Sequence, residues 1–319
     1  MSFSTDIKEE LAHISLDKKC CMLAEIAGFV RVCGSVRIRS GKMTPIIVLD
    51  NLEVAAHFQE IFREYYGVAM EMEITPGTSL RKGNLYQMEV VDPEGQMGEK
   101  ILRETGILMV REGFDTLTDG IYEGLVKTKC CKKSYLRGAF LGAGTVSNPE
   151  KGYHLEFVLN TEVLARDLVK LINSFVDLHA KVTQRKNRWV VYVKESEQII
   201  DILNIVGAHG HLLKYEEIRL ARDLRNSANR LKNCDDANTD KIVNTAQRQL
   251  QAIRIIEEKR GLSFLPEKLH EMALLRKEYP EVGLAELGER MEPPLKKSGV
   301  NHRLKKIEEI AAQIREKAK

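Results

Sequence analysis

The chain lacks the features that carry a protein into or across a membrane. Its most apolar stretch, residues 23–36, is interrupted by Glu25 and Arg31 and is shorter than the roughly 20 apolar residues that a spanning helix needs. Residues 1–14 contain acidic side chains and no apolar core, so they do not resemble an export signal. We therefore expect a cytoplasmic protein with no membrane segment.

The chain also lacks a large excess of charge of one sign. Its 49 Lys and Arg are nearly balanced by 46 Asp and Glu, which leaves a formal net charge of +3. Such a balance excludes a uniformly basic protein that coats nucleic acid. If the chain binds DNA, its positive charge must be concentrated in patches. With 319 residues, of which 43% are hydrophobic, the chain is long enough for two domains.

Cysteine is scarce, and its spacing does not resemble a disulfide framework. Four of the six cysteines form two adjacent pairs, Cys20/Cys21 and Cys130/Cys131. Four thiolates can hold zinc, but adjacent cysteines rarely bind one ion together and the sequence has no CxxC spacing. We therefore expect small buried thiols, no metal and no cofactor. The segment AHGH, residues 208–211, is expected to be a turn rather than a ligand pair.

Two segments of the sequence are copies of one another. CCMLAEIAGFVRVCGSV at residues 20–36 aligns without a gap on CCKKSYLRGAFLGAGTV at residues 130–146. Small residues spaced along a helix allow two helix backbones to approach closely, and a second glycine suits the end of the helix. The aligned glycines are Gly28 with Gly138 and Gly34 with Gly144. The duplication therefore predicts two similar halves that meet through these helices.

Each copy is followed by the same predicted order of elements. Alternating apolar runs indicate two strands, a helix, a hairpin of two further strands and a final helix. The halves occupy residues of about 20–110 and 130–210, within a domain over residues 1–213. The predicted fold class is α+β, with a duplicated αββαββα unit followed by helices.

The motifs AGFVRVCG and RGAFLGAG resemble those of LAGLIDADG homing endonucleases. The resemblance implies a saddle whose sheets lie on DNA and whose motif helices each end in a metal-binding acid. Here those positions hold Cys33 and Ala143, and neither offers the hard oxygen ligand that magnesium requires. Because the cleavage reaction needs that metal, we expect a retained scaffold without nuclease chemistry. The alternative is an endonuclease that recruits its metal through other carboxylates, such as Glu25 or Asp50.

Basic residues recur at the predicted hairpin tips of both halves. They are Arg81 and Lys82 in the first half and Arg185, Lys186 and Arg188 in the second. A two-fold saddle on DNA would contact phosphates there, but hairpin tips are also commonly charged and exposed, so both interpretations stay open. A further acid-free run either flanks the same surface or solubilises the approach to the second motif helix. Its members are Lys127, Lys129, Lys132, Lys133 and Arg137.

Helical periodicity replaces the strand signals from Lys214 onward. Two apolar stripes predict a helical linker over residues 214–261, in two segments that the polar sequence NCDDANTD separates. The linker is expected to space and dock the domains. The stripes are Ala221, Leu224, Ala228 and Leu231, then Val243, Ala246, Leu250 and Ile253.

Residues 262–319 predict a domain of three helices. Pro266 is expected in the first turn of one helix, and Ser298 is expected to cap the last. A helix pair with a short connection that ends in a basic helix is typical of the helix-turn-helix, although the stretch MEPPLKK is longer than the usual turn. The apolar stripe of the last helix is Val300, Leu304, Ile307, Ala311 and Ile314.

The face opposite this stripe carries the predicted DNA contacts. From Lys296 to Lys306 the sequence holds five positive charges and no acid. Asn301 and His302 suit base edges, and Ser298 suits a phosphate or a base. The predicted contact residues are Lys296, Lys297, Ser298, Asn301, His302, Arg303, Lys305 and Lys306. The alternative is an ordinary helical hairpin with a solvated basic face.

The combination of these parts resembles the WhiA family of bacterial regulators. The resemblance covers nearly the whole chain, and PPLKKSGVNHRLKKI is its most specific stretch. It implies a nucleoid-associated, non-catalytic protein that binds double-stranded DNA and regulates transcription in sporulation, or that serves cell division and chromosome segregation. A protein partner, such as another transcription regulator or a polymerase subunit, is compatible with it. The competing functions are the metal-dependent endonuclease and a protein-docking module.

Overall fold

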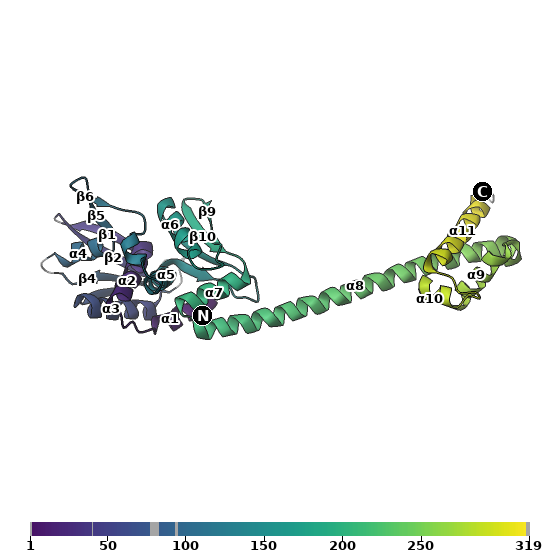
Figure 1. Cartoon of the computed structure of the whole chain (residues 1–319), viewed down its shortest axis with the longest axis horizontal. Helices are drawn as coiled ribbons and strands as arrows, with labels where there is room; N and C mark the ends of the chain where they lie inside the picture. Colours follow the sequence, from purple (N-terminus) through teal and green to yellow (C-terminus); the bar gives the residue numbers. More distant parts are fainter. Residues whose placement is uncertain (1, 40, 77–82, 93–94, 317–319) are drawn as a thin grey trace. The chain divides into compact units, whose positions relative to one another are not determined.

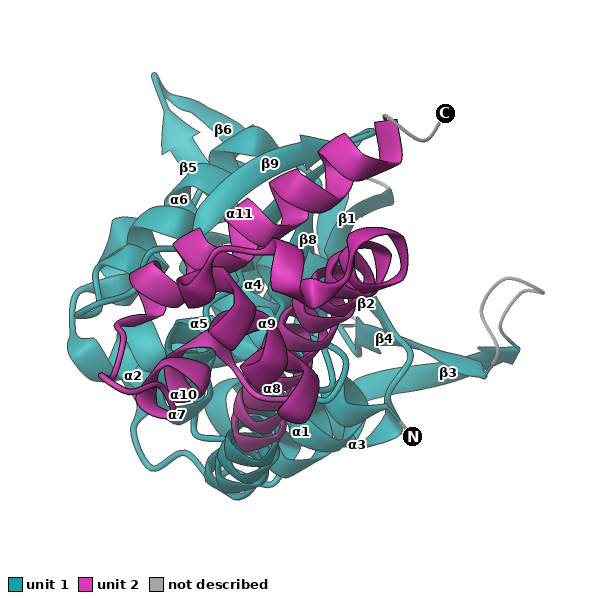
Figure 2. Cartoon of the chain, turned by 90° about the vertical axis from the view of Figure 1, so that its right-hand side faces the viewer, with its two compact units in different colours: residues 1–222 teal, residues 223–319 magenta. Residues whose placement is uncertain are grey.

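A computed structural model describes residues 2–39, 41–76, 83–92 and 95–316 of the chain (Figure 1). The chain divides into two compact units, residues 1–222 and residues 223–319, shown in teal and magenta in Figure 2. The division lies inside the region 214–261 that the sequence predicts to be a linker. No helix among the described residues is both long enough and apolar enough to cross a membrane.

The first unit contains the predicted αββαββα arrangement twice, which confirms the fold class. The first copy comprises α2 (Lys19–Cys33), β1 (Gly34–Arg39), β2 (Lys42–Leu49), α3 (Leu52–Tyr66), β3 (Met70–Pro76), β4 (Asn84–Val90) and α4 (Met97–Glu104). The second comprises α5 (Lys129–Ala143), β7 (Gly144–Val146), β8 (Leu155–Leu159), α6 (Glu162–Asn173), β9 (Lys181–Arg185), β10 (Arg188–Val193) and α7 (Ser196–Val206).

The two copies build sheets of the same topology. The strand orders are β1-β2-β4-β3 and β7-β8-β10-β9, and every pair of neighbours is antiparallel. The first strand of each sheet begins at the second motif glycine. Gly34 lies opposite Ile47, and Gly144 lies opposite Phe157, so the duplicated sequence sets the same register in both halves.

Short polar side chains and glycines set the ends of the helices in both copies. Asn51 caps α3 by accepting a hydrogen bond from the amide of Val54, and Thr161 caps α6 by accepting one from the amide of Leu164. Gly67 and Gly207 end α3 and α7 in the left-handed conformation that glycine adopts without a steric penalty.

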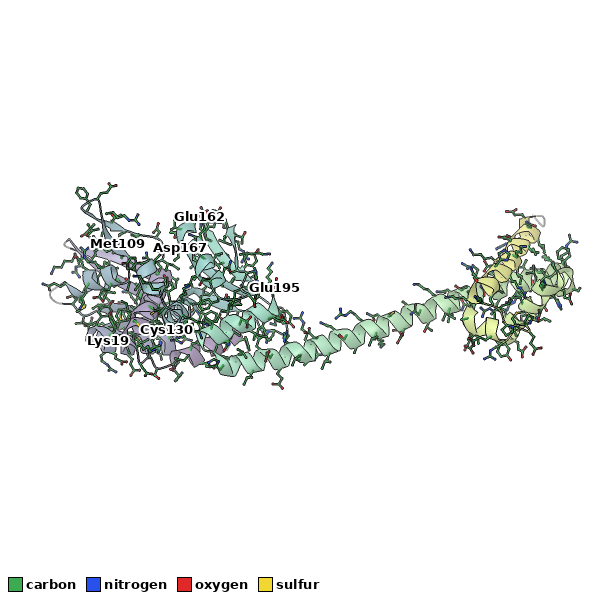
Figure 3. The ribbon with its side chains drawn as sticks, viewed as in Figure 1. Lys19, Met109, Cys130, Glu162, Asp167 and Glu195 are labelled. Carbon is green, nitrogen blue, oxygen red and sulfur yellow. The ribbon has the colours of Figure 1, made fainter. Side chains whose placement is uncertain are left out.

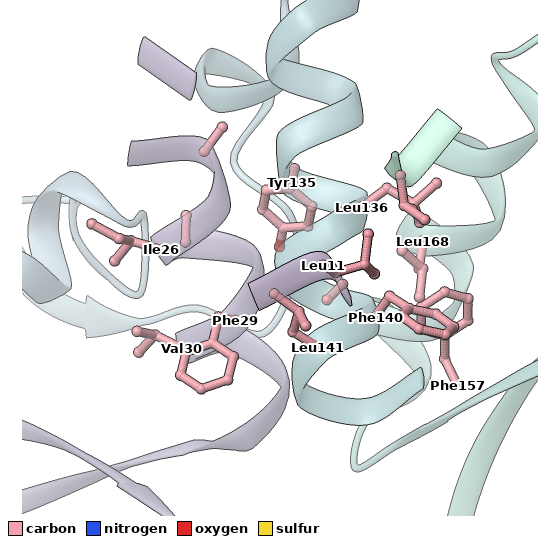
Figure 4. Close-up of a cluster of buried hydrophobic side chains, with 14 of the residues drawn as sticks. Leu11, Ile26, Phe29, Val30, Tyr135, Leu136, Phe140, Leu141, Phe157 and Leu168 are labelled. Atoms are coloured by element: carbon pink, nitrogen blue, oxygen red, sulfur yellow. The ribbon is translucent and has the colours of Figure 1, made fainter. Parts of the chain in front are cut away.

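The motif helices α2 and α5 pack against each other through their glycines. A Cβ atom on Gly28 would lie 2.2 Å from the carbonyl oxygen of Tyr135, and one on Gly138 would lie 2.1 Å from that of Glu25. The predicted close approach is therefore present at both symmetry-related positions. Large apolar side chains, among them Phe29 and Phe140, surround this contact and form the core of the unit (Figure 4).

Four elements of the first unit fall outside the sequence prediction. They are α1 (Phe3–Ala12), the hairpin β5 (Leu108–Arg111) and β6 (Phe114–Leu117), and the short 3-10 helix η1 (Glu123–Val126). Ser2 caps α1, and Ile7 and Leu11 of this helix are fully buried. The N-terminal segment therefore belongs to the core, although the sequence analysis used it only to argue against an export signal.

The region that the sequence predicts to be two helical segments is one helix, α8 (His209–Arg260). The polar stretch at residues 233–240 contains neither glycine nor proline, and Asn, Asp and Thr each cost only about 0.7 kcal/mol or less in a helix interior. The predicted first stripe is not buried, since Leu224 and Leu231 are 73% and 68% exposed. The helix begins at His209, so the expected turn at AHGH is wrong, and Glu10 of α1 accepts a hydrogen bond from the amide of Gly210 there.

The second unit is a small helical domain. It comprises α8 from Asp223 onward, η2 (Leu262–Phe264), α9 (Glu267–Glu278), α10 (Leu284–Glu289) and α11 (Lys297–Glu316). Pro266 lies at the residue before α9 rather than in its first turn. The core joins Met272 of α9, Leu287 of α10 and the predicted stripe of α11 to Ile253 and Ile256 of α8.

Candidate nucleic-acid interface

The last helix, α11, begins at Lys297, two residues earlier than a cap at Ser298 predicts. Ser298 lies inside the helix, so it does not cap it. The carbonyl oxygen of Lys296 instead accepts the first hydrogen bonds, from the amides of Gly299 at 2.8 Å and Val300 at 3.2 Å. The side chain of Ser298 is exposed and remains available to a ligand.

The two faces of α11 differ as the sequence predicts. Val300, Leu304 and Ile307 are fully buried, and Ala311 is almost so, whereas Ile314 is only partly buried. Asn301 and Arg303 are half-buried. A guanidinium nitrogen of Arg303 lies 3.5 Å from the carbonyl oxygen of Lys268, in the first turn of α9. The remaining predicted contact residues are exposed: Lys296, Lys297, Ser298, His302, Lys305 and Lys306.

Gly288 of α10 closes the long connection between α10 and α11, a role that the sequence pattern did not indicate. The amide of Leu295 donates to the carbonyl oxygen of Gly288 at 2.9 Å. A Cβ atom on Gly288 would lie 2.1 Å from the carbonyl oxygen of Leu295 and 3.0 Å from the Val300 side chain. The extra residues of the connection therefore fold back onto α10, and α11 still packs against α10.

Two arginines hold the loop before α10, and neither was identified from the sequence. Arg276 is buried and donates to the carbonyl oxygens of Tyr279 at 3.3 Å and Val282 at 2.7 Å, and burial lowers its pKa. Arg290 lies 4.1 Å from the centre of the Tyr279 ring and donates to Glu286 at 2.8 Å. These contacts set the position of α10 and, through it, that of α11.

Four of the five Lys and Arg residues of α11 lie in its first half, and the fifth is Arg315 in the last turn. The first acid after Lys296 is Glu308, which accepts from Arg248 of α8 at 3.0 Å and is therefore partly neutralised. The exposed surface of residues 296–306 thus presents cations and neutral donors without a competing carboxylate. This is the charge pattern that a helix needs when it approaches phosphates.

In the first unit, the positions where a homing endonuclease would hold its metal carry no oxygen ligand. The thiol of Cys33 donates to the carbonyl oxygen of Phe29 at 3.0 Å, and burial raises its pKa so that it stays protonated at neutral pH. Ala143 offers only a methyl group. Lys8 of α1 interacts electrostatically with both Cys33 and Asp50, so an ammonium group lies near the degenerate centre; burial lowers its pKa.

Of the two carboxylates named as replacement ligands, Glu25 is already occupied, whereas Asp50 is exposed. Glu25 is fully buried, and its Oε1 lies 2.9 Å from Nε2 of His57 while its Oε2 accepts from Nε of Arg137 at 2.7 Å. Arg137 also donates to the carbonyl oxygen of Val206. Glu25 is therefore a structural partner, and Arg137 does not belong to the exposed basic run in which the sequence analysis placed it.

The outer faces of both sheets carry mixed charge. In the second sheet, Arg185, Lys186 and Arg188 are exposed at the β9–β10 turn, and Arg185 pairs with Glu156 at 3.4 Å. In the first sheet, three glutamates lie on the face turned away from the core, and Arg37 of β1 donates to one of them, Glu89, at 2.6 Å; the other two are Glu71 and Glu73. The predicted contacts Arg81 and Lys82 lie outside the described residues. The predicted two-fold set of phosphate contacts therefore stays a prediction, because only its second half lies among the described residues.

The remaining lysines of the basic run lie around a hollow of about 560 Å³ at the start of α5. Lys127, Lys129, Lys132 and Lys133 share its wall with Asp177 and Asp201, so its charge is mixed. The structure also brings the two cysteine pairs of α2 and α5 together, with all four sulfur atoms within 4.8 Å of one another. The spacing of the cysteines along the sequence argued against a shared site, because it does not reveal that the two pairs meet.

Three family models match consecutive parts of this chain. The WhiA N-terminal LAGLIDADG-like domain matches residues 19–108, the WhiA LAGLIDADG-like domain matches residues 132–225, and the WhiA C-terminal HTH domain matches residues 228–311. The chain belongs to the WhiA family. The motif helix α2 lies wholly within a matched range, and most of α5 and of α11 lies within the other two.

Relatives of known sequence and structure agree over the full length. Proteins named probable cell division protein WhiA are 46% identical over 316 residues in Clostridium perfringens and 44% identical over 318 residues in Thermoanaerobacter pseudethanolicus, with 99% of both chains covered in each case. The crystal structure of full-length DUF199/WhiA from Thermatoga maritima is 25% identical and has a TM-score of 0.58, covering 98% of this chain and 99% of that one.

Proposed function

We propose that this WhiA-family chain is a non-catalytic DNA-binding protein whose helix α11 enters the major groove. The observation that carries the proposal is the exposed, acid-free face at the start of α11. In helix-turn-helix proteins, the first residues of the second helix contact base edges, and flanking basic groups contact phosphates. In this proposal, the phosphates are contacted by four lysines: Lys296, Lys297, Lys305 and Lys306. The base edges are contacted by Ser298, Asn301 and His302.

The name of the relatives gives the proposed process. Because these proteins are called probable cell division proteins, we propose that DNA binding here regulates transcription, either in cell division and chromosome segregation or in sporulation. The first unit contributes affinity through the Arg185, Lys186 and Arg188 turn, or recruits a partner such as another transcription regulator or a polymerase subunit. The absence of oxygen ligands at Cys33 and Ala143 and the occupied state of Glu25 support a role without cleavage.

Binding of the full chain to duplex DNA, measured by fluorescence anisotropy at several salt concentrations, tests the proposal. Lys305→Ala is expected to weaken binding to all sequences and to lower the slope of log affinity against log salt by about one unit, because one phosphate contact is lost. Lys241→Ala is the matched control, since Lys241 is an exposed lysine on α8 and its loss changes the net charge equally. Equal binding by all three proteins, or no binding of wild type at low salt, would contradict the proposal and favour a protein-docking module.

A further inference from the structure

Four cysteines from the two halves of the first unit meet at one place. Cys20 and Cys21 are the second and third residues of α2, and Cys130 and Cys131 are the second and third residues of α5. Figure 3 labels Lys19 and Cys130, which mark the starts of these two helices. Since the helices approach closely at Gly28 and Gly138, their first turns also come together, and the four Sγ atoms all lie within 4.8 Å of one another.

We propose that this four-cysteine cluster is a structural zinc site that ties the two repeats together. A tetrahedral zinc ion has Zn–S distances of about 2.3 Å, which places its four sulfurs about 3.8 Å apart. The observed separations exceed this value by at most about 1 Å, a difference that rotation of the cysteine side chains supplies. Each helix contributes two ligands, and the ion sits on the pseudo-two-fold axis that the duplication creates.

The helix starts and lysines around the cluster favour negative charge, whereas burial raises the pKa of the Cys21 and Cys131 thiols in the metal-free chain. Zinc with four thiolates carries two net negative charges, and the starts of two helices supply unpaired amide groups and the positive end of the helix dipole. Neither α2 nor α5 has an acid in its first turn. Lysines flank both pairs in the sequence instead: Lys18 and Lys19 in the first half, and Lys129, Lys132 and Lys133 in the second.

A neighbouring hydroxyl orients one of the ligands. The hydroxyl of Thr128 lies 3.2 Å from Sγ of Cys130 and also caps α5 by accepting from the amide of Cys131. Such outer contacts fix the direction of metal ligands. Without an ion, the thiol of Cys131 donates to the carbonyl oxygen of Cys20 at 3.6 Å; a zinc-bound thiolate has no proton, so the bond to zinc would replace this hydrogen bond. Cys21 and Cys131 are buried, whereas Cys20 is exposed, so an ion has access from one side.

Other occupants fit the cluster less well. Magnesium and calcium prefer oxygen ligands to sulfur. A four-iron cluster binds one thiolate on each of four separate iron atoms, so its cysteine sulfurs lie farther apart than those around a single ion. With all four positions filled by protein, the ion has no open site for substrate, so its role is structural rather than catalytic. Its loss is expected to loosen the α2–α5 contact, on which both sheets depend.

Metal content of the full-length chain tests the proposal. The chain is produced with added zinc chloride and purified under reducing conditions without chelator, and bound metal is measured by mass spectrometry. We expect one zinc per chain in the wild type, and less than about one tenth of that in the double variants Cys21→Ser/Cys131→Ser and Cys20→Ser/Cys130→Ser. The second pair changes the more accessible thiols and so perturbs the core less. The control is Cys33→Ser/Cys234→Ser, which removes two thiols outside the cluster and should keep the zinc.

Cobalt provides a readout that does not depend on any variant. Titration of the reduced, metal-free wild type with Co²⁺ should give the intense sulfur-to-cobalt absorption and the visible bands of a tetrahedral site, saturating at one equivalent and displaced by zinc. The proposal is overturned if the wild type retains no zinc and gives no such spectrum, if it retains iron in place of zinc, or if disulfides link the four cysteines under reducing conditions. Equal zinc loss in the control variant would also overturn it.

Discussion

Glycine positions decide how closely the helices of this protein approach one another. Gly28 and Gly138 face the backbone of the opposite motif helix, and Gly288 faces the backbone of the connection before α11. In each case the space for a Cβ atom is filled by a carbonyl oxygen rather than by a flexible side chain. The sequence revealed the first two through the duplication, whereas Gly288 has no copy elsewhere in the chain and its role follows only from the path of the chain.

Gly28→Ala is expected to destabilise the first unit. Alanine raises helix propensity by up to about 1 kcal/mol, but its Cβ atom would lie 2.2 Å from the Tyr135 carbonyl oxygen, and relief of such overpacking costs about 1–3 kcal/mol. We expect a net loss of about 1–2 kcal/mol in the free energy of unfolding, measured by urea denaturation. Gly152→Ala is the control, because open space surrounds that position. An unchanged Gly28→Ala protein would refute the close packing of α2 and α5.

Glu25→Gln is expected to be among the most damaging single changes in the chain. The substitution leaves Arg137 buried with its charge unpaired, and removal of one partner from a buried ion pair costs about 3–5 kcal/mol. Glu60→Gln breaks an exposed pair with Arg63 and should cost less than about 0.5 kcal/mol. The midpoints of chemical unfolding compare the two variants. Similar midpoints would show that Glu25 is not an internal partner, and would reopen its use as a metal ligand.

At the scale of elements, duplication made the first unit predictable. Two gapless copies of the motif helix, each with the same downstream pattern, fixed the order of strands and helices and the position of Cys33 and Ala143. The sequence did not predict α1, because ten residues with Asp6, Lys8, Glu9 and Glu10 look polar, although Ile7 and Leu11 are fully buried. It did not predict β5 and β6 either, since they lie between the copies and have no repeat partner.

The linker prediction was wrong for a physical reason that applies to many helices. Polar residues such as those at 233–240 weaken a helix only slightly, and they end it only when a capping geometry, glycine or proline is present. The same weakness affected the prediction that Ser298 is a cap. A serine at the first turn of a helix is often a cap, but the turn of the chain at Lys296 begins α11 earlier.

Proline in the polar stretch of α8 tests its continuity. Asp236→Pro removes an internal hydrogen bond and costs about 3 kcal/mol in a helix interior, so it is expected to lower the helical circular dichroism signal and to open residues 231–240 to protease. Asp236→Ala at the same position should raise helicity slightly and leave the cleavage pattern unchanged. If wild type is already cut within 231–240 as fast as the proline variant, the helix is interrupted there as the sequence suggested.

At the scale of the whole molecule, the duplicated architecture and the exposed basic helix lie in different units. The first unit keeps the duplicated architecture but presents a neutral thiol, a methyl group and a nearby lysine where oxygen ligands would be required. The second unit carries the exposed basic helix. The sequence predicted the degenerate centre and the basic helix from residue types alone. It could not predict that the four cysteines meet or that Glu25 is paired, because these contacts join segments more than 100 residues apart, such as Glu25 with Arg137.

The protein is expected to leave DNA intact. Supercoiled plasmid incubated with the full chain and magnesium or manganese should remain supercoiled, because the degenerate centre cannot hold the ion that activates water. Gel electrophoresis after long incubation checks this, with a chelator-containing sample as the control. Nicking or linearisation that the chelator abolishes would show that other carboxylates restore the metal site.

Sequence selection from a pool of randomised duplexes tests the central claim most directly, because it asks whether α11 faces the bases. The wild-type chain should enrich a defined motif, while Asn301→Ala and His302→Ala should each bind DNA yet relax the preference at one or more positions of that motif. If the wild type enriches no motif, or if both variants enrich the wild-type motif without change, α11 does not read DNA sequence.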